Sequence, residues 1–176
     1  VHLGLDIWMA AESLVFAPLD GVIHSLRVNG GDRDYGPTVI IAHQVSEDLT
    51  FYTLYGHLSK LSLTHLYRGQ EVKKGDIIAS IGRSGENGGW PPHLHFQLIL
   101  DLLGWRGDFP GVAFPEDREV WLSLCPDPAG LLQGIPEAYP IKPLSIDGIL
   151  TARKAHLGKS LSISYQHPLH IQRAYK

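Results

Sequence analysis

The sequence predicts an all-β fold, an antiparallel β-sandwich or barrel over residues 1–103, followed by a proline-rich connector. Two observations predict it. Between residues 13 and 83, short runs rich in Val, Ile, Thr, Phe and Tyr alternate with turns that contain Gly, Asp or Pro, which is the pattern of strands joined by tight connections. After residue 103 this alternation stops and prolines become frequent, so we expect the sheet domain to end there.

The predicted strands are short apolar runs bounded by turn residues, and they cover residues 14–16, 21–23, 37–42, 49–55 and 76–81. Residues 28–36 contain Asn-Gly-Gly-Asp and indicate a hairpin loop, and Gly69 and Gly75 bracket a second tight reversal. Such folds pack one sheet face on the core and leave the other available as the floor of a groove. In that groove, residues 88–90 are expected to form part of a wall, or else a surface loop with a half-buried Trp90.

Residues 104–150 are predicted to be a connector that packs where it can. Prolines stand at positions 110, 115, 126, 128, 136, 140 and 143. Residues 116–125 are consistent with one or two amphipathic helical turns, and residues 126–132 with a helical turn that begins at proline. A core of about a hundred residues is large enough to fold without this segment.

The composition is that of an ordinary globular chain, with 44% hydrophobic and 19% charged residues and a formal net charge of −3. Lys and Arg are scattered, so no basic stripe indicates a nucleic-acid partner. No stretch approaches the ~20 apolar residues of a membrane helix, and no signal peptide is visible. Because Val1 already stands beside the first histidine motif, we expect a segment that continues into further domains.

Two clusters of histidine and aspartate indicate a metal site. In His93-Leu-His95 the histidines stand at positions i and i+2 of a run with β character, so both point to one face. One imidazole can therefore bind a metal while the other hydrogen-bonds to water or substrate. In His2-Leu-Gly-Leu-Asp6 the glycine argues against a helix, and we expect this pair on a strand end and the bend after it.

A His/Asp/His set with one ligand from the second cluster carries a single negative charge and predicts Zn²⁺ with a water in the fourth position. His57, in Tyr-Gly-His-Leu-Ser, lies between the two clusters in the sequence. The remaining histidines receive no role, and among them His43 is the strongest candidate for a place near the site, behind the ligands.

These motifs resemble those of the lysostaphin-type, or LytM-like, zinc endopeptidases. The resemblance covers roughly residues 1 to 100. It rests on seven segments in the same order, at residues 2–7, 15–22, 39–43, 55–59, 69–78, 81–85 and 93–96. It implies zinc ligands at His2, Asp6 and His95, with His57 and His93 as the non-ligand pair that positions the water and stabilises the oxyanion. It also implies a peptide or peptidoglycan-like substrate, cut at cross-link peptide bonds.

Residues 151–176 resemble the opening of class-III, pyridoxal-phosphate-dependent aminotransferases, in a Ser/Tyr-rich stretch followed by Pro-Leu-His-Ile-Gln-Arg. The alternative interpretation of this segment is a basic, solvated tail. If the resemblance holds, the chain is the middle of a fusion and a cytoplasmic location follows. The single Cys125 excludes an internal disulfide and agrees with a reducing compartment. A signal upstream would instead place the protein in the cell envelope.

Two functions follow from these patterns. The first is a zinc metalloendopeptidase in which His57 and His93 assist a metal-activated water. The second is a non-catalytic metal- or ligand-binding module within a larger cytosolic aminotransferase fusion. The complete motif set favours the first, and the tail favours the second.

Overall fold

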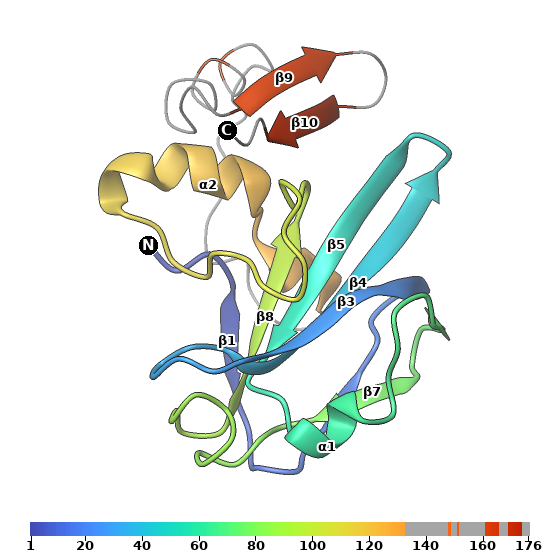
Figure 1. Ribbon diagram of the computed structural model, residues 1–176, viewed down its shortest axis with the longest axis vertical. Coiled ribbons are helices and arrows are strands. Elements are labelled where there is room, and N and C mark those ends of the chain that lie inside the picture. The colour runs from blue at the N-terminus through green and yellow to red at the C-terminus, as the bar shows by residue number, and fades with distance from the viewer. Residues whose placement is uncertain (133–147, 149–150, 152–160, 166–168, 174–176) are drawn as a thin grey trace.

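The computed structural model describes residues 1–132, 148, 151, 161–165 and 169–173. Within these residues the main element is a six-stranded antiparallel sheet (Figure 1). In spatial order its strands are β1 (Leu5–Trp8), β8 (His93–Ile99), β5 (Leu49–Gly56), β4 (Gly36–Ser46), β3 (Gly21–Asn29) and β6 (Glu71–Val72). A separate antiparallel pair joins β2 (Leu14–Phe16) and β7 (Ile77–Ser80). The predicted all-β antiparallel class is confirmed.

The strand register explains why residues far apart in sequence meet. Asp6 in β1 lies opposite His95 in β8, and His95 also lies opposite Gly56 at the end of β5. The residue after Gly56 is His57, so the end of β5 reaches the same point. Three predicted site residues are therefore placed by two strand pairings.

Apolar clusters cover both faces of the central strands. Successive side chains of a strand point to opposite faces, so one strand contributes to both clusters. Val39 and Ile41 belong to one apolar cluster, which includes the β2–β7 pair. Ile40 and Leu54 point the other way, into a second cluster. The second cluster also contains buried residues from beyond the main sheet: Leu102, Leu103, Phe109, Leu124 and Cys125. The second face is thus covered along part of its length, where the sequence led us to expect an uncovered floor.

The chain after residue 103 supplies that cover. It contains two 3₁₀ turns, η1 (Pro115–Asp117) and η2 (Pro128–Leu131), on either side of α2 (Arg118–Leu124). The predicted helical turns are confirmed. The Leu100 amide donates to the carbonyl of Leu124 at 2.8 Å, so α2 lies beside the end of β8. Whether residues 1–103 fold without this segment stays a prediction.

The other elements are α1 (Lys60–Leu63) and a C-terminal pair, β9 (Leu161–Tyr165) and β10 (Leu169–Arg173), which pair with each other. Most of the predicted connector from 133 onward lies outside the described residues, as does much of the aminotransferase-like tail. In the described part of the chain, no helix has the length and apolar character needed to cross a membrane.

Candidate metal centre

The predicted ligands come from two neighbouring strands and the segment that leads into one of them. Asp6 is the second residue of β1, whereas His2 lies before it in an isolated bridge with Val112. The chain bends at Gly4, between the two residues. The expected placement on a strand end and the bend after it was wrong, because the bend separates the pair and Asp6 lies within the strand.

Gly4 permits this bend to pack tightly. A Cβ added at Gly4 would lie 2.7 Å from His95 Nε2 and 2.7 Å from the Phe96 carbonyl oxygen, closer than any side chain can approach. The backbone of the first motif therefore lies directly against the His95 ring. This contact brings the side chain of His2 over the β1–β8 pair.

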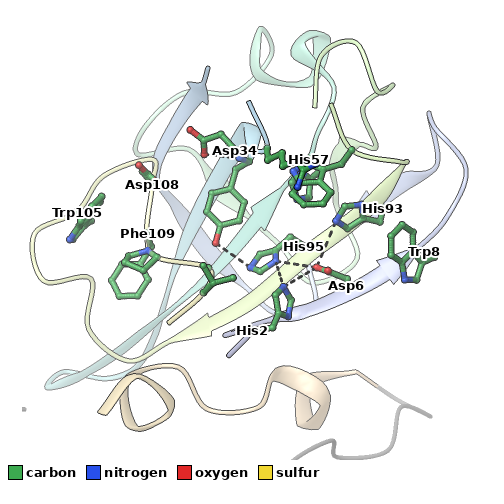
Figure 2. A pocket seen from close by; sticks show the side chains of 16 residues that line it. His2, Asp6, Trp8, Asp34, His57, His93, His95, Trp105, Asp108 and Phe109 are labelled. Carbon is green, nitrogen blue, oxygen red and sulfur yellow. Dashed lines mark hydrogen bonds and ion pairs between the residues drawn. The ribbon is translucent and has the colours of Figure 1, made fainter. Parts of the chain in front are cut away.

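Three possible metal-ligand atoms, one each from His2, Asp6 and His95, lie close together beside the β1–β8 pair (Figure 2). His2 Nε2 lies 3.1 Å from His95 Nδ1, and Asp6 Oδ1 lies 3.3 Å from His2 Nε2 and 3.1 Å from His95 Nδ1. The ligand atoms of the three residues all lie within 4.8 Å of one another. His95 is buried, while His2 and Asp6 are partly open to solvent.

Hydrogen bonds behind the rings indicate which nitrogens face the centre. His2 Nδ1 lies 2.8 Å from the Gly4 carbonyl oxygen, which only accepts, so Nδ1 carries the proton and Nε2 presents a lone pair. His95 Nε2 lies 3.0 Å from Gln97 Oε1, which leaves Nδ1 with the lone pair. Two imidazole lone pairs and a carboxylate then meet, and this is an arrangement that a bound cation would stabilise. Two imidazoles and a carboxylate form a donor set that Zn²⁺ takes in hydrolytic sites, so the residues fit this metal.

The electrostatics agree with a cation-binding cluster. Burial would raise the pKa of Asp6, but the contacts of its carboxylate with the His2 and His95 rings outweigh burial and hold the pKa well below its ordinary value. Contact with this carboxylate, which favours a charged imidazole, raises the pKa of His2. Asp6 is therefore ionised at neutral pH and supplies the negative charge of the cluster.

His57 and His93 stand beside this cluster without joining it. Their ring centroids are 4.3 Å apart, and His93 Nε2 lies 3.8 Å from Asp6 Oδ1. His57 Nδ1 donates to the Asn87 carbonyl at 2.9 Å, and His93 Nδ1 donates to the Pro91 carbonyl at 2.7 Å. Each ring therefore presents an Nε2 lone pair. Burial, chiefly, lowers the pKa of His57 to about 4, so this ring is neutral at neutral pH.

The backbone at His57 is unusual. His57 has a φ of 61°, in the left-handed region, and its amide donates to the Tyr35 carbonyl at 2.8 Å. Non-glycine residues adopt this conformation uncommonly, and functional sites are one place where it occurs. The conformation turns the chain at the end of β5 and directs the ring toward His93.

A cavity of about 450 Å³ opens over the five residues. Trp8 and Trp90 line it near His93. Figure 2 shows Trp105, Asp108 and Phe109 at the opposite end. The expectation that Trp90 forms part of a groove wall is confirmed. Gly88 and Gly89 are not among the lining residues.

Sequence reasoning named His43 as the strongest candidate among the other histidines for a place near the site, and His43 is not among the residues that line the cavity. His43 lies in β4, where its ring bonds to the Asp20 carbonyl and the Thr53 hydroxyl, outside the cavity lining. Two contacts of His95 were missed instead, those with Tyr35 and Gln97. The period-2 pattern from His93 and His95 could have identified Gln97, which is next on the same face. No local signal points to Tyr35.

Comparisons with known proteins identify the chain as a metallopeptidase. The model of peptidase family M23 matches residues 1–102, and the chain belongs to this family. A protein of Haemophilus influenzae described as an uncharacterized metalloprotease is 34% identical over 100 residues, which are 57% of this chain. The chain spans only 19% of that relative.

Solved structures show the same fold. The catalytic domain of lysostaphin from Staphylococcus simulans is 25% identical, with a TM-score of 0.52 over 76% of this chain and 80% of that one. A putative M23 peptidase from Pseudomonas aeruginosa also has a TM-score of 0.52, at 21% identity, over 77% of this chain and 45% of that one. The second likeness supports the fold alone.

Proposed function

We propose that this chain is a zinc-dependent metalloendopeptidase domain that hydrolyses peptide bonds of the peptidoglycan cross-link type. One observation carries the proposal. In an M23 family chain, the lone pairs of His2 and His95 converge with Asp6, and two further histidine rings stand beside them in the lining of one cavity. This arrangement provides a cation site and a pair of proton acceptors within reach of one substrate bond.

Each residue has a distinct part in this mechanism. His2, Asp6 and His95 hold Zn²⁺, which when bound supplies Lewis acidity and lowers the pKa of a coordinated water to about 7. The Nδ1 atoms of His57 and His93 donate to backbone carbonyls, which leaves Nε2 of each ring toward the cavity, where a neutral ring can accept a proton from the attacking water. A ring that has accepted a proton becomes a donor, and it can then hydrogen-bond to the oxyanion that forms at the substrate carbonyl.

The cavity suits an extended peptide. Trp8 is 65% exposed and its ring lies 4.7 Å from that of His93, so it offers a flat apolar surface beside the proposed reaction centre. Trp90 is a second aromatic side chain in the cavity lining, and its ring centroid lies 6.2 Å from that of His93. Small residues such as glycine or D-alanine pass between such walls with least steric hindrance, which is the basis for proposing a cross-link peptide as the substrate.

The deciding experiment measures zinc content by elemental analysis and cleavage of glycine-rich and D-alanyl cross-link peptides, for the wild type and for His95→Ala. We expect near one zinc per chain in the wild type, and loss of both zinc and cleavage in the variant. His65→Ala, at an exposed histidine, is the matched control and keeps both. Zinc without cleavage of any peptide would favour a binding module, and absence of zinc from the folded wild type would refute the metal centre.

The alternative is a non-catalytic metal- or ligand-binding module in a larger fusion. Its support is the sequence of residues 151–176, which resembles the opening of an aminotransferase. Continuity with a pyridoxal-phosphate-dependent domain and a cytoplasmic location are proposals that rest on the same segment. Reading the gene beyond both ends of the chain tests them, since a cofactor-binding lysine downstream favours the fusion and a secretory signal upstream favours the cell envelope.

A further inference from the structure

His95 differs from the other three site histidines in what holds the back of its ring. The rings of His2, His57 and His93 each donate from Nδ1 to a backbone carbonyl within a loop. His95 instead has a side chain behind it, with Gln97 Oε1 at 3.0 Å from Nε2. A side-chain amide can turn over and offer either oxygen or nitrogen, so the state of His95 depends on what orients Gln97.

The structure orients Gln97 from the opposite side. Gln97 is fully buried, and its Nε2 donates to the Pro110 carbonyl at 3.1 Å and to Cys125 Sγ at 3.2 Å. A carbonyl oxygen only accepts, so the amide nitrogen must face Pro110 and the amide oxygen must face His95. His95 Nε2 is therefore the protonated nitrogen, and Nδ1 presents its lone pair to His2 and Asp6.

Tyr35 closes the same network. Its hydroxyl donates to Gln97 Oε1 at 3.4 Å and lies 3.3 Å from His95 Nε2. The phenol hydroxyl is thus a second donor to the amide oxygen of Gln97, which agrees with that oxygen facing His95. Gly111 packs against this hydroxyl, and a Cβ there would lie 2.0 Å from the oxygen.

The two groups that accept hydrogen bonds from the Gln97 amide nitrogen, the Pro110 carbonyl and Cys125 Sγ, both belong to residues 110–125. This segment lies beyond residues 1–102, which match the family model. The same segment also pairs with the strand end that carries His2, since Leu3 donates to the Gly111 carbonyl at 2.9 Å. The chain after residue 103 thus contacts the supports of two proposed ligands.

We propose that Gln97 is a positioning residue that keeps the proton of His95 on Nε2, so that Nδ1 is available to the metal, and that residues 110–125 hold Gln97 in this orientation. The inference rests on the proposed function, in which His95 is a zinc ligand. Without the Gln97 acceptor, His95 can place its proton on Nδ1 and donate it to Asp6 Oδ1, 3.1 Å away. That tautomer blocks the ligand position.

The test compares Gln97→Leu, which keeps the volume but removes the acceptor, with Thr53→Val. Thr53 is equally buried and bonds to His43 and Tyr55, outside the site, so Thr53→Val controls for the loss of a buried polar group. Zinc dissociation constants are measured by chelator competition, and the His95 tautomer is read by ¹⁵N NMR of the zinc-free protein. In Gln97→Leu we expect about 10- to 100-fold weaker zinc binding and a shift of the proton toward Nδ1.

A second pair tests the segment. Gly111→Ala pushes on the Tyr35 hydroxyl and should weaken zinc binding, whereas Gly130→Ala, where a Cβ meets nothing within 4 Å, should not. An unchanged His95 tautomer in Gln97→Leu overturns the proposal, and weaker zinc binding without a tautomer change would assign Gln97 to packing alone. Because the tautomer is read without zinc or substrate, failure of the peptidase proposal and failure of this one are distinguishable.

Discussion

The rings of His57 and His93 lie 4.3 Å apart, and each donates its Nδ1 proton to a backbone carbonyl. Both therefore turn a lone pair toward the cavity without being needed to close the His2–Asp6–His95 cluster. This relationship separates two functions within one site. Binding the metal belongs to one set of residues, and handling the proton of the attacking water belongs to the other.

His57→Asn tests that separation, since asparagine tolerates the positive φ of this position. We expect kcat for a cross-link peptide to fall by about 10²- to 10⁴-fold, the range of general-base contributions, while zinc content stays near that of the wild type. Peptide cleavage and elemental analysis measure the two effects. His65→Asn, on the surface, is the control, and loss of zinc from His57→Asn would contradict the assigned role.

Gly4→Ala is expected to weaken zinc binding, because its Cβ would press on His95 Nε2 and on the Phe96 carbonyl oxygen. The bend must then move, and His2 moves with it. Chelator competition measures the effect, which we expect to exceed about tenfold, as for other disruptions next to metal ligands. Gly30→Ala has nothing within 4 Å of its Cβ and should bind zinc as the wild type does. Equal affinities in the two variants would show that the close packing at Gly4 is dispensable.

Phe109→Ala tests whether the segment after residue 103 belongs to the folded core. Phe109 is 1% exposed in the second apolar cluster, so truncation leaves a cavity and should lower the free energy of unfolding by about 3–5 kcal/mol. Urea unfolding measures it. Phe114→Ala removes the same atoms from a side chain that is 73% exposed and should change stability little. Similar losses in both variants would place Phe109 outside the stabilising core.

The stability of the chelator-treated protein should depend on pH through His43. Burial lowers the pKa of His43, so between the unfolded value of about 6.5 and the lower folded value the unfolded state binds more protons. The contribution of neutral His43 is fully present above pH 6.5 and is lost as the pH falls through the folded pKa. Urea unfolding between pH 7 and 5 should show a shallower pH dependence for His43→Gln than for the wild type. His65→Gln is the control. If the free energy of unfolding of His43→Gln depends on pH as steeply as that of the wild type, His43 is not the cause of the pH dependence.

Local patterns predicted much of the fold and the composition of the site. The runs at 14–16 and 49–55 became β2 and β5 with the predicted starts, because β-branched and aromatic residues between turn residues define such strands well. The strand at 21–23 was predicted too short, since β3 continues to Asn29 through alternating polar and apolar residues that pair with β4. Cross-strand pairing, which the local sequence does not contain, extended that strand.

The sequence by itself determined which residue types are available and which of them share a face. The period of two aligns His93, His95 and Gln97 on β8, and Gly4 argued against a helix for His2 and Asp6. Only the tertiary structure decided which nitrogen of each ring faces the centre. That choice depends on the hydrogen-bond partner behind each ring. For His95 the partner is Gln97, which is oriented by groups 13 and 28 residues further along the chain. A pattern of residue types carries no information on such contacts, because packing of the segment after residue 103 creates them.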